Sequence, residues 1–233
     1  MAFQLIAHFI RLTPAERLYH LTRPLIGLTG SIAAGKSTAL NYLASYATTI
    51  SADALIHQIY QQAKTIAFLK EHFPLALTPH APPHHLNKTY LRQLFLTNDA
   101  EATALEDFLY RELEPCFKQA VEEKEKGKHN HDQNRKSNVS SSPIIFEVPL
   151  LFEKHWESKF DQIIGIDASP VVQKARLRER HLEDAEIAQF MAHQLTGKAK
   201  MQRCFWQIRN DGDLAALQAA VQDLAQQIFT PIV

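Results

Sequence analysis

Cysteine is scarce in this 233-residue chain, since Cys116 and Cys204 are the only two and stand in no metal-binding spacing. This scarcity argues against a disulfide scaffold or a zinc ribbon and suits a reducing compartment, so we expect a cytoplasmic protein. Long apolar runs are also missing, because none approaches the ~18–20 residues that a membrane helix needs. The sequence therefore predicts no membrane association.

Charge of one sign is not in excess either. Lys plus Arg number 25, as do Asp plus Glu, so no global field exists to gather nucleic acid or an anionic membrane. We expect no nucleic-acid partner, and the sequence indicates no obligate protein partner. An anionic ligand must instead be bound by a local cluster of donors. The apolar content of 45% is ordinary for a globular protein that buries a sizeable core.

Short apolar runs alternate with segments of helical periodicity along most of the chain. The predicted strands cover residues 25–28, 48–51, 144–148, 163–167 and, more weakly, 206–208. The predicted helices cover residues 36–46, 53–62, 64–72, 88–124, 170–181, 184–194 and 213–229, and Pro115 is expected to bend or divide the fourth. Residues 74–85 hold four prolines and are predicted to form a loop. Such alternation implies an α/β fold with a parallel sheet covered on both faces.

Two segments stand apart from this alternation. Met1–Leu12 is rich in apolar residues and is predicted to form a short amphipathic helix that docks on the body or on a partner. Residues 124–142 are polar and carry a single Val and no other aliphatic or aromatic side chain. Because such a stretch cannot offset its ordering entropy by burial, it is predicted to be a mobile surface insertion.

Residues 30–37 read Gly-Ser-Ile-Ala-Ala-Gly-Lys-Ser and match the pattern G-x-x-x-x-G-K-[ST] at every position. Gly30 and Gly35 allow the unusual backbone angles that let N–H groups converge on phosphate oxygens. Lys36 would bring a charge to the β- and γ-phosphates, and the Ser37 hydroxyl would ligate Mg²⁺. The motif lies between a predicted strand and a predicted helix. That context favours a nucleotide-binding loop over a structural turn.

Asp53 follows the second predicted strand, whose carboxyl end shares one crevice with this loop in a parallel sheet. A carboxylate there can accept the proton of an attacking hydroxyl or help to order a metal. Asp is also a favoured N-cap, so Asp53 could simply cap the helix that follows. Position alone leaves both interpretations open.

Further charged residues extend the pattern. Glu147 closes the apolar run from Ile144 to Phe146 in the third predicted strand, where enzymes with this loop keep a metal-organising carboxylate, and Glu153 follows six residues later. Gln173, Arg176 and Arg180 fall on one helical face through their spacings of three and four. Two arginines aimed together suit a lid that neutralises charge on a transferring phosphoryl group. The alternatives are exposed acids and a solvated basic face.

From about Leu25 to Val221, these segments together resemble the dephospho-coenzyme A kinase family. The segments that carry the resemblance are Ile26–Gly30 with Gly35–Thr38, Ser51-Ala52-Asp53, Glu147-Val148-Pro149-Leu150-Leu151-Phe152-Glu153, the Gln173/Arg176/Arg180 helix, Gln194, Lys200 and Ile208–Gly212. The segment from Glu147 to Glu153 is similar to the family's Asp-x-Pro-Leu-Leu-x-Glu and is the most diagnostic match.

The resemblance implies a P-loop nucleotide-kinase-like fold of three layers, with a five-stranded parallel sheet, a helical acceptor-binding subdomain and a lid. Residues 1–24 would be an N-terminal extension and residues 25–233 the kinase domain. Within that domain the implied helical acceptor region covers about 64–123, the polar insertion 124–142 and the lid about 176–200.

The resemblance also implies an activity: transfer of the ATP γ-phosphate, with Mg²⁺, to the ribose 3′-hydroxyl of dephospho-coenzyme A. The products would be coenzyme A and ADP, in the last step of coenzyme A biosynthesis. Asp53 would act as the base, Lys36 and Arg180 would be catalytic, and Ser37 would bind the metal. The implied nucleotide-binding residues are Gly30, Ala33, Ala34, Gly35, Lys36, Ser37, Thr38, Arg176 and Asn210.

Several positions depart from the family pattern and are assigned to its acceptor half. Ser51 and Glu147 stand where the family has Asp, Lys88 replaces an arginine, Tyr110-Arg111 replaces His-Pro, and Phe205 replaces an Asp. A P-loop kinase for a nucleoside or nucleotide therefore stays open, as does a nucleotide-dependent interaction module. The Pro-Leu-Leu-Phe-Glu segment and the lid arginines favour a kinase over a module.

Overall fold

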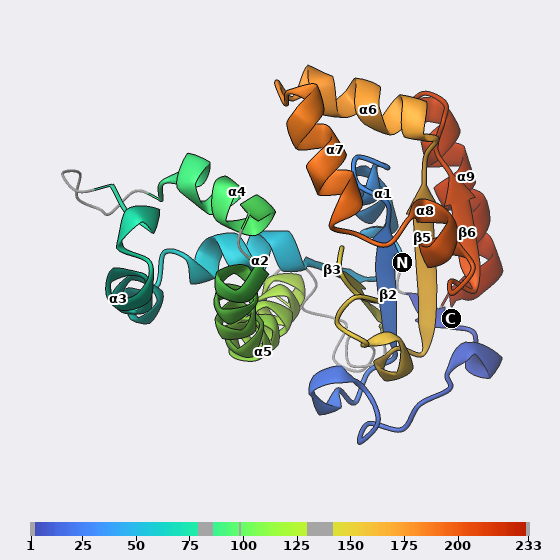
Figure 1. Ribbon diagram of the computed structural model, residues 1–233. Helices are drawn as coiled ribbons and strands as arrows, with labels where there is room; N and C mark the ends of the chain where they lie inside the picture. Colours follow the sequence, from blue (N-terminus) through green and yellow to red (C-terminus); the bar gives the residue numbers. More distant parts are fainter. Residues whose placement is uncertain (1–2, 79–85, 98, 130–141, 232–233) are drawn as a thin grey trace. The chain divides into compact units, whose positions relative to one another are not determined.

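The computed structural model describes residues 3–78, 86–97, 99–129 and 142–231, and Figure 1 shows their course. Their contacts divide the chain into two compact units. The first combines Met1–Ser51 with Ala120–Val233, and the second is Ala52–Gln119. The main sheet belongs entirely to the first unit.

A five-stranded parallel sheet forms the centre of the first unit, with the strand order β3-β4-β2-β5-β6. Its strands are β2 (Leu25–Gly30), β3 (Thr48–Ser51), β4 (Ile144–Glu147), β5 (Gln162–Asp167) and β6 (Trp206–Arg209). Strands β2, β4 and β5 are buried along their whole length, which explains their nearly continuous apolar sequences. The predicted parallel sheet is confirmed.

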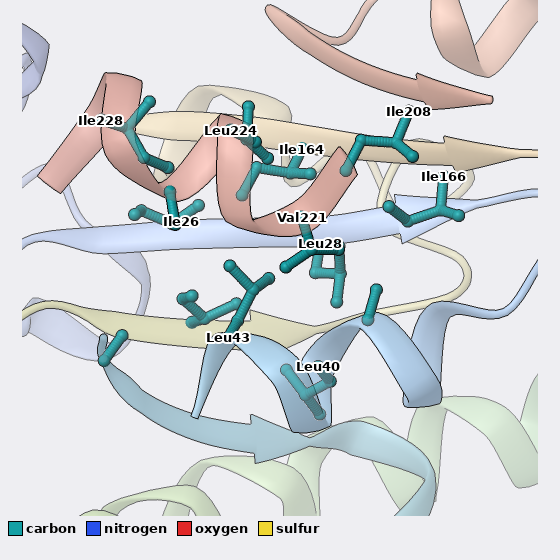
Figure 2. Packing of buried hydrophobic residues seen from close by; sticks show 14 of the residues in the cluster. Ile26, Leu28, Leu40, Leu43, Ile164, Ile166, Ile208, Val221, Leu224 and Ile228 are labelled. Atoms are coloured by element: carbon teal, nitrogen blue, oxygen red, sulfur yellow. The ribbon is translucent and has the colours of Figure 1, made fainter. Parts of the chain in front are cut away.

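Helices α1 (Lys36–Leu43) and α9 (Leu214–Ile228) pack on one face of this sheet. Apolar residues recur in α9 at intervals of three or four, so Val221, Leu224 and Ile228 form one buried stripe. Figure 2 shows the core that results, in which the labelled side chains are Ile26, Leu28, Leu40, Leu43, Ile164, Ile166, Ile208, Val221, Leu224 and Ile228.

The other face of the sheet carries a second helical layer. Residues alternate in direction along a strand, so Gly165 faces away from the core that Ile164 and Ile166 enter. A Cβ on Gly165 would lie 2.7 Å from Cys204 Sγ, because the chain that follows α8 (Gly197–Met201) passes directly over β5. Helices on both faces give the three layers that were predicted.

Three short helices connect β5 to β6 (Figure 1). They are α6 (Pro170–Glu179), α7 (Asp184–Ala192) and α8 (Gly197–Met201). Each begins at a polar residue that satisfies helical N–H groups: Ser169 and Thr196 cap α6 and α8, and Glu183 with Glu186 forms a capping box at α7.

The N-terminal segment contains a strand where a helix was predicted. Strand β1 (Phe3–Leu5) pairs antiparallel with β7 (Phe229–Pro231), which directly follows α9. Leu5 joins the core beside α9, and the short 3₁₀ turns η1 (Ala7–Phe9) and η2 (Leu18–His20) follow. The helix prediction was wrong because the pairing partner comes from the opposite end of the sequence, which local periodicity does not reveal.

The second unit is helical. Its elements are α2 (Ala52–Ile59), α3 (Ala63–His72), the 3₁₀ turn η3 (Pro74–Ala76), α4 (Lys88–Thr97) and the greater part of α5 (Asp99–His129). Phe68 of α3 stacks on Phe108 of α5 with 3.9 Å between ring centroids. Within the predicted loop, η3 is followed by a bridge between Leu77 and Leu86, and residues 79–85 lie outside the described residues.

Helix α5 corrects two predictions. It contains Pro115 within one helix, so this proline does not divide it. It also continues to His129, whereas an irregular insertion was predicted from residue 124 onward. Lys124 Nζ donates to the Thr49 carbonyl at 2.7 Å, and Glu125 Oε1 accepts from Arg23 Nη1 at 2.6 Å. Polar contacts therefore order the start of that segment, whose remainder, 130–141, lies outside the described residues.

Candidate active site

A sharp loop joins β2 to α1 and contains the phosphate motif. Gly30 has a φ of 147° and Gly35 a φ of 97°, and a Cβ on Gly30 would collide with the Ile166 carbonyl oxygen. Ala33 also has a positive φ, of 54°. The loop leads directly into α1, where N–H groups without helical partners can bind an anion. The strand–loop–helix context predicted for the motif is thus confirmed.

The Lys36 ammonium lies over its own loop. Its Nζ donates to the carbonyl oxygens of Ser31 at 2.8 Å and of Gly30 at 3.3 Å. A phosphate oxygen in the loop would be a stronger acceptor, because it is charged. The side chain is therefore held where it can exchange a loop carbonyl for a phosphate.

Ser37 and Glu147 meet at the carboxyl ends of β2 and β4. Glu147 is buried, with Leu28 opposite it in register on one side and Ser51 on the other. Ser37 Oγ donates to Glu147 Oε1 at 3.3 Å. Hydroxyl and carboxylate oxygens are hard ligands of the kind that Mg²⁺ prefers, so the chemistry of this pair fits a magnesium site.

Two predicted nucleotide-binding side chains contact the middle of the loop. Asn210 Nδ2 donates to the Ala34 carbonyl at 2.7 Å, and Arg176 Nη1 donates to the Ala33 carbonyl at 3.2 Å. Arg176 Nη2 also donates to the Gly212 carbonyl at 3.4 Å. The family resemblance predicts that these residues contact the nucleotide, and the structure adds that both donate to the loop backbone.

Asp167, which the sequence analysis did not single out, joins the same loop. It ends β5 as Glu147 ends β4, and its Oδ1 accepts from Ser31 Oγ at 2.6 Å. Its Oδ2 forms an ion pair with Arg209 Nη1 at 3.1 Å. An acid that closes an apolar strand is the signal that drew attention to Glu147, and the same signal was present at Asp167.

The predicted lid face is only partly directed at the loop. Gln173 is buried and its Nε2 donates to the Ala168 carbonyl at 2.6 Å, while Arg176 reaches the loop. Arg180 comes after the end of α6 and is exposed. Arg178 Nε, from the same helix, forms an ion pair with Asp184 Oδ1 at 2.7 Å. Of the two predicted arginines, Arg176 is thus the one that contacts the loop.

Asp53 lies in the first turn of α2, in the second unit. Helix α2 begins at Ala52, so Asp53 is a helical residue. It does not occupy the N-cap position that the purely structural alternative assigned to it. A carboxylate is favoured in a first turn by the helix dipole. The chain enters α2 directly from Ser51, whose backbone pairs with Glu147.

Phe205 lies at the opposite end of the parallel strands from the loop. It directly precedes β6, at the amino ends of the parallel strands, whereas the loop follows the carboxyl end of β2. Its ring packs against Phe9 at 6.2 Å and Trp206 at 5.1 Å between centroids. This departure from the family pattern therefore concerns the N-terminal segment and not the phosphate loop.

A parallel α/β sheet with this loop after its central strand, and with Ser37 against a buried acid on the next strand, defines a P-loop nucleotide-binding protein. The model of the dephospho-CoA kinase family matches residues 24–216, which is most of the chain. The chain belongs to the dephospho-CoA kinase family, and it is an enzyme of the phosphotransferase class.

Individual relatives agree with this assignment. The chain is 31% identical to a dephospho-CoA kinase of Lactiplantibacillus plantarum over 84% of this chain and 94% of the relative. It is 27% identical to one of Bartonella quintana over 89% of this chain and 96% of the relative. A crystal structure from Thermus thermophilus shares the fold, with a TM-score of 0.64 and 24% identity over 88% of this chain and 97% of that one.

Proposed function

We propose that this enzyme transfers the γ-phosphate of ATP to the ribose 3′-hydroxyl of dephospho-coenzyme A, giving coenzyme A and ADP. The observation that carries the proposal is the arrangement of Lys36 and Ser37 in the phosphate loop with Glu147 beside Ser37. It occurs in a chain that the model of this family matches over residues 24–216. In the reaction, the 3′-oxygen forms a bond to the γ-phosphorus as the bond from that phosphorus to the β–γ bridging oxygen breaks.

The loop residues would bind and orient the nucleotide. Backbone N–H groups before and within α1 would receive the β-phosphate, and Lys36 would move from the Ser31 carbonyl to the β- and γ-phosphates. Ser37 would be a ligand of Mg²⁺, with Glu147 orienting the hydroxyl through the contact that the structure shows. When bound, the ion would neutralise phosphate charge.

Two further residues are assigned to the transfer itself. Asp53 would accept the proton of the 3′-hydroxyl as the new bond forms. Arg180, exposed beyond the end of α6, would stabilise charge on the transferring phosphoryl group, and Arg176 would hold the loop and the nucleotide. Gly30, Ala33, Ala34, Gly35, Thr38 and Asn210 would complete the nucleotide site.

We propose a cytoplasmic location for this activity. Cys116 and Cys204 are both free and buried, which suits a reducing compartment. No helix in the described part of the chain combines the length and apolar character needed to cross a bilayer.

An assay of ADP release with several acceptors tests the proposed function. The purified chain would be given ATP, Mg²⁺ and either dephospho-coenzyme A, a nucleoside panel or a nucleotide panel, with the product identified by mass and phosphorus NMR. We expect turnover with dephospho-coenzyme A and phosphate on the 3′-oxygen. Faster turnover with a nucleoside or nucleotide would assign the acceptor half, with Lys88, Tyr110 and Arg111, to another substrate. Nucleotide binding without any turnover would favour an interaction module.

A further inference from the structure

Lys200 is a fully buried cation in α8, with 0% of its surface exposed. Its Nζ donates to the Pro149 carbonyl at 2.8 Å and pairs with Glu153 Oε1 at 3.0 Å. The same nitrogen donates to Gln194 Oε1 at 3.3 Å and to the Gly30 carbonyl at 3.5 Å. An ammonium placed out of water is costly unless it is paired, so four acceptors around one nitrogen mark a built site.

These acceptors come from three segments that are distant in the sequence. Gly30 opens the phosphate loop, Pro149 and Glu153 follow β4, and Gln194 lies between α7 and α8. Burial lowers the pKa of the Lys200 ammonium, while the carboxylate of Glu153 works in the opposite direction. Glu153 Oε1 also accepts from the Leu195 N–H at 3.0 Å, so the ion pair joins the α7–α8 connection to the chain after β4.

Two lysines share the Gly30 carbonyl. Lys36 Nζ lies 3.3 Å from this oxygen and Lys200 Nζ 3.5 Å. The Pro149 carbonyl, which Lys200 also binds, accepts from Thr29 Oγ1 at 3.3 Å. Lys200 therefore contacts the end of β2 directly at Gly30 and indirectly, through Pro149, at Thr29. If Lys36 leaves the Gly30 carbonyl for a phosphate, Lys200 still satisfies that carbonyl and keeps the loop entrance in place.

We propose that Lys200 is a positioning residue that holds the entrance of the phosphate loop in its nucleotide-binding shape by binding Gly30 and Pro149 from α8. The inference rests on the proposed function for its kinetic consequences. Loss of Lys200 should affect the binding of ATP and ADP more than the binding of the acceptor. The Gly30 and Pro149 carbonyls lie at the end of β2, where the phosphate loop begins, and neither residue belongs to the second unit.

Substitution of Lys200 by Met tests this role. Met preserves most of the length and apolar stem but cannot donate. We expect Lys200→Met to raise the KM for ATP and the Kd for ADP at least tenfold, while the KM for dephospho-coenzyme A changes less than threefold. Lys198→Met is the matched control, because Lys198 lies in the same short helix and is exposed, and it should leave all three constants within twofold.

A second pair of variants separates loop positioning from simple charge balance. Lys200→Met leaves the Glu153 carboxylate without its buried partner, so the protein should melt at a lower temperature. In the double variant Lys200→Met/Glu153→Gln that carboxylate is gone, and we expect the melting temperature to recover in part while the Kd for ADP stays raised. Glu153→Gln alone keeps Lys200 on both carbonyls and should bind ADP within threefold of the parent.

The opposite results would overturn the proposal. If the double variant regains parental ADP affinity, or if Glu153→Gln weakens ADP binding as much as Lys200→Met does, the ion pair is the cause and the carbonyl contacts are not. Should Lys200→Met fail to fold, the double variant gives the same comparison. ADP titration by calorimetry needs no acceptor, so it tests Lys200 even if dephospho-coenzyme A proves not to be the substrate.

Discussion

Arg17 and Asp161 form a buried ion pair that fastens the N-terminal segment to the sheet. Arg17 Nε donates to Asp161 Oδ2 at 2.6 Å, and neither side chain is more than 3% exposed. The carboxylate also accepts from the backbone N–H groups of Arg11 and Leu12, both at 2.9 Å, and of Leu25 at 2.8 Å. One acid thus joins the segment before residue 24 to the first residue of β2, so this segment is integral to the fold of the first unit.

Acid should weaken this connection. Burial by itself would raise the pKa of Asp161, but the hydrogen bonds from Arg17 and the three backbone N–H groups outweigh it and hold that pKa below its usual value. A lowered folded-state pKa contributes stability that is present above the unfolded pKa, ~3.9, and is lost as the pH falls through the folded value. We expect the free energy of unfolding to drop below about pH 4, and we expect Asp161→Asn to flatten that part of the profile.

The same variant should also be less stable at neutral pH. Asp161→Asn leaves the Arg17 guanidinium buried without its counter-charge, which typically costs about 3–5 kcal/mol. Asp184→Asn is the control, because it breaks an exposed pair with Arg178 and should change stability far less. Urea unfolding from pH 3 to 8 measures both effects. Equal stability of the two variants at pH 7 would contradict the structural role given to Asp161.

Lys36→Ala should abolish most of the activity and preserve the fold. The side chain donates to two carbonyls of its own loop, those of Ser31 at 2.8 Å and Gly30 at 3.3 Å. In the Ala variant no ammonium group neutralises charge on the β- and γ-phosphates during phosphoryl transfer. We therefore expect kcat/KM to fall by about 10³ or more. Initial rates and the melting temperature on one preparation check this, and near-normal turnover would reject the loop assignment.

Asp53→Asn separates a proton acceptor from a helix-stabilising acid. Asn keeps the shape of the side chain and loses only the charge. If Asp53 acts only through the helix dipole in the first turn of α2, the variant should lose ~0.3–1 kcal/mol of folding stability. Loss of a general base instead costs about 10²–10⁴ in rate. We expect kcat to fall about a hundredfold or more, with the Kd for ATP unchanged. Turnover within a few-fold of the parent would show that Asp53 takes no part in the chemistry.

The parallel sheet and the local motifs of this molecule could be predicted from the sequence, whereas particular contacts between distant segments could not. The loop from Gly30 to Ser37 carries its geometry in its own residues, and Glu147 is marked by the apolar strand that it ends. Lys200 is different, because its acceptors come from residues 30, 149, 153 and 194, so its burial depends on the complete fold. The pairing of β1 with β7 is likewise a contact between chain ends.

The polar segment 124–142 gives the last prediction, because its first residues belong to α5 and residues 130–141 lie outside the described part of the chain. Arg23 is buried, and its guanidinium binds Glu125 as well as the Ser142 carbonyl at 2.6 Å. Glu125→Gln removes a counter-charge of this cation, and because the Glu125 side chain is 34% exposed the expected cost is about 1–3 kcal/mol, less than for a fully buried pair. Replacing residues 130–141 with a Gly/Ser link of equal length keeps Glu125 and should change stability by no more than about 1 kcal/mol. Urea unfolding of the two variants beside the parent decides, and a linker variant less stable than Glu125→Gln would show that the replaced residues contribute to the folded state.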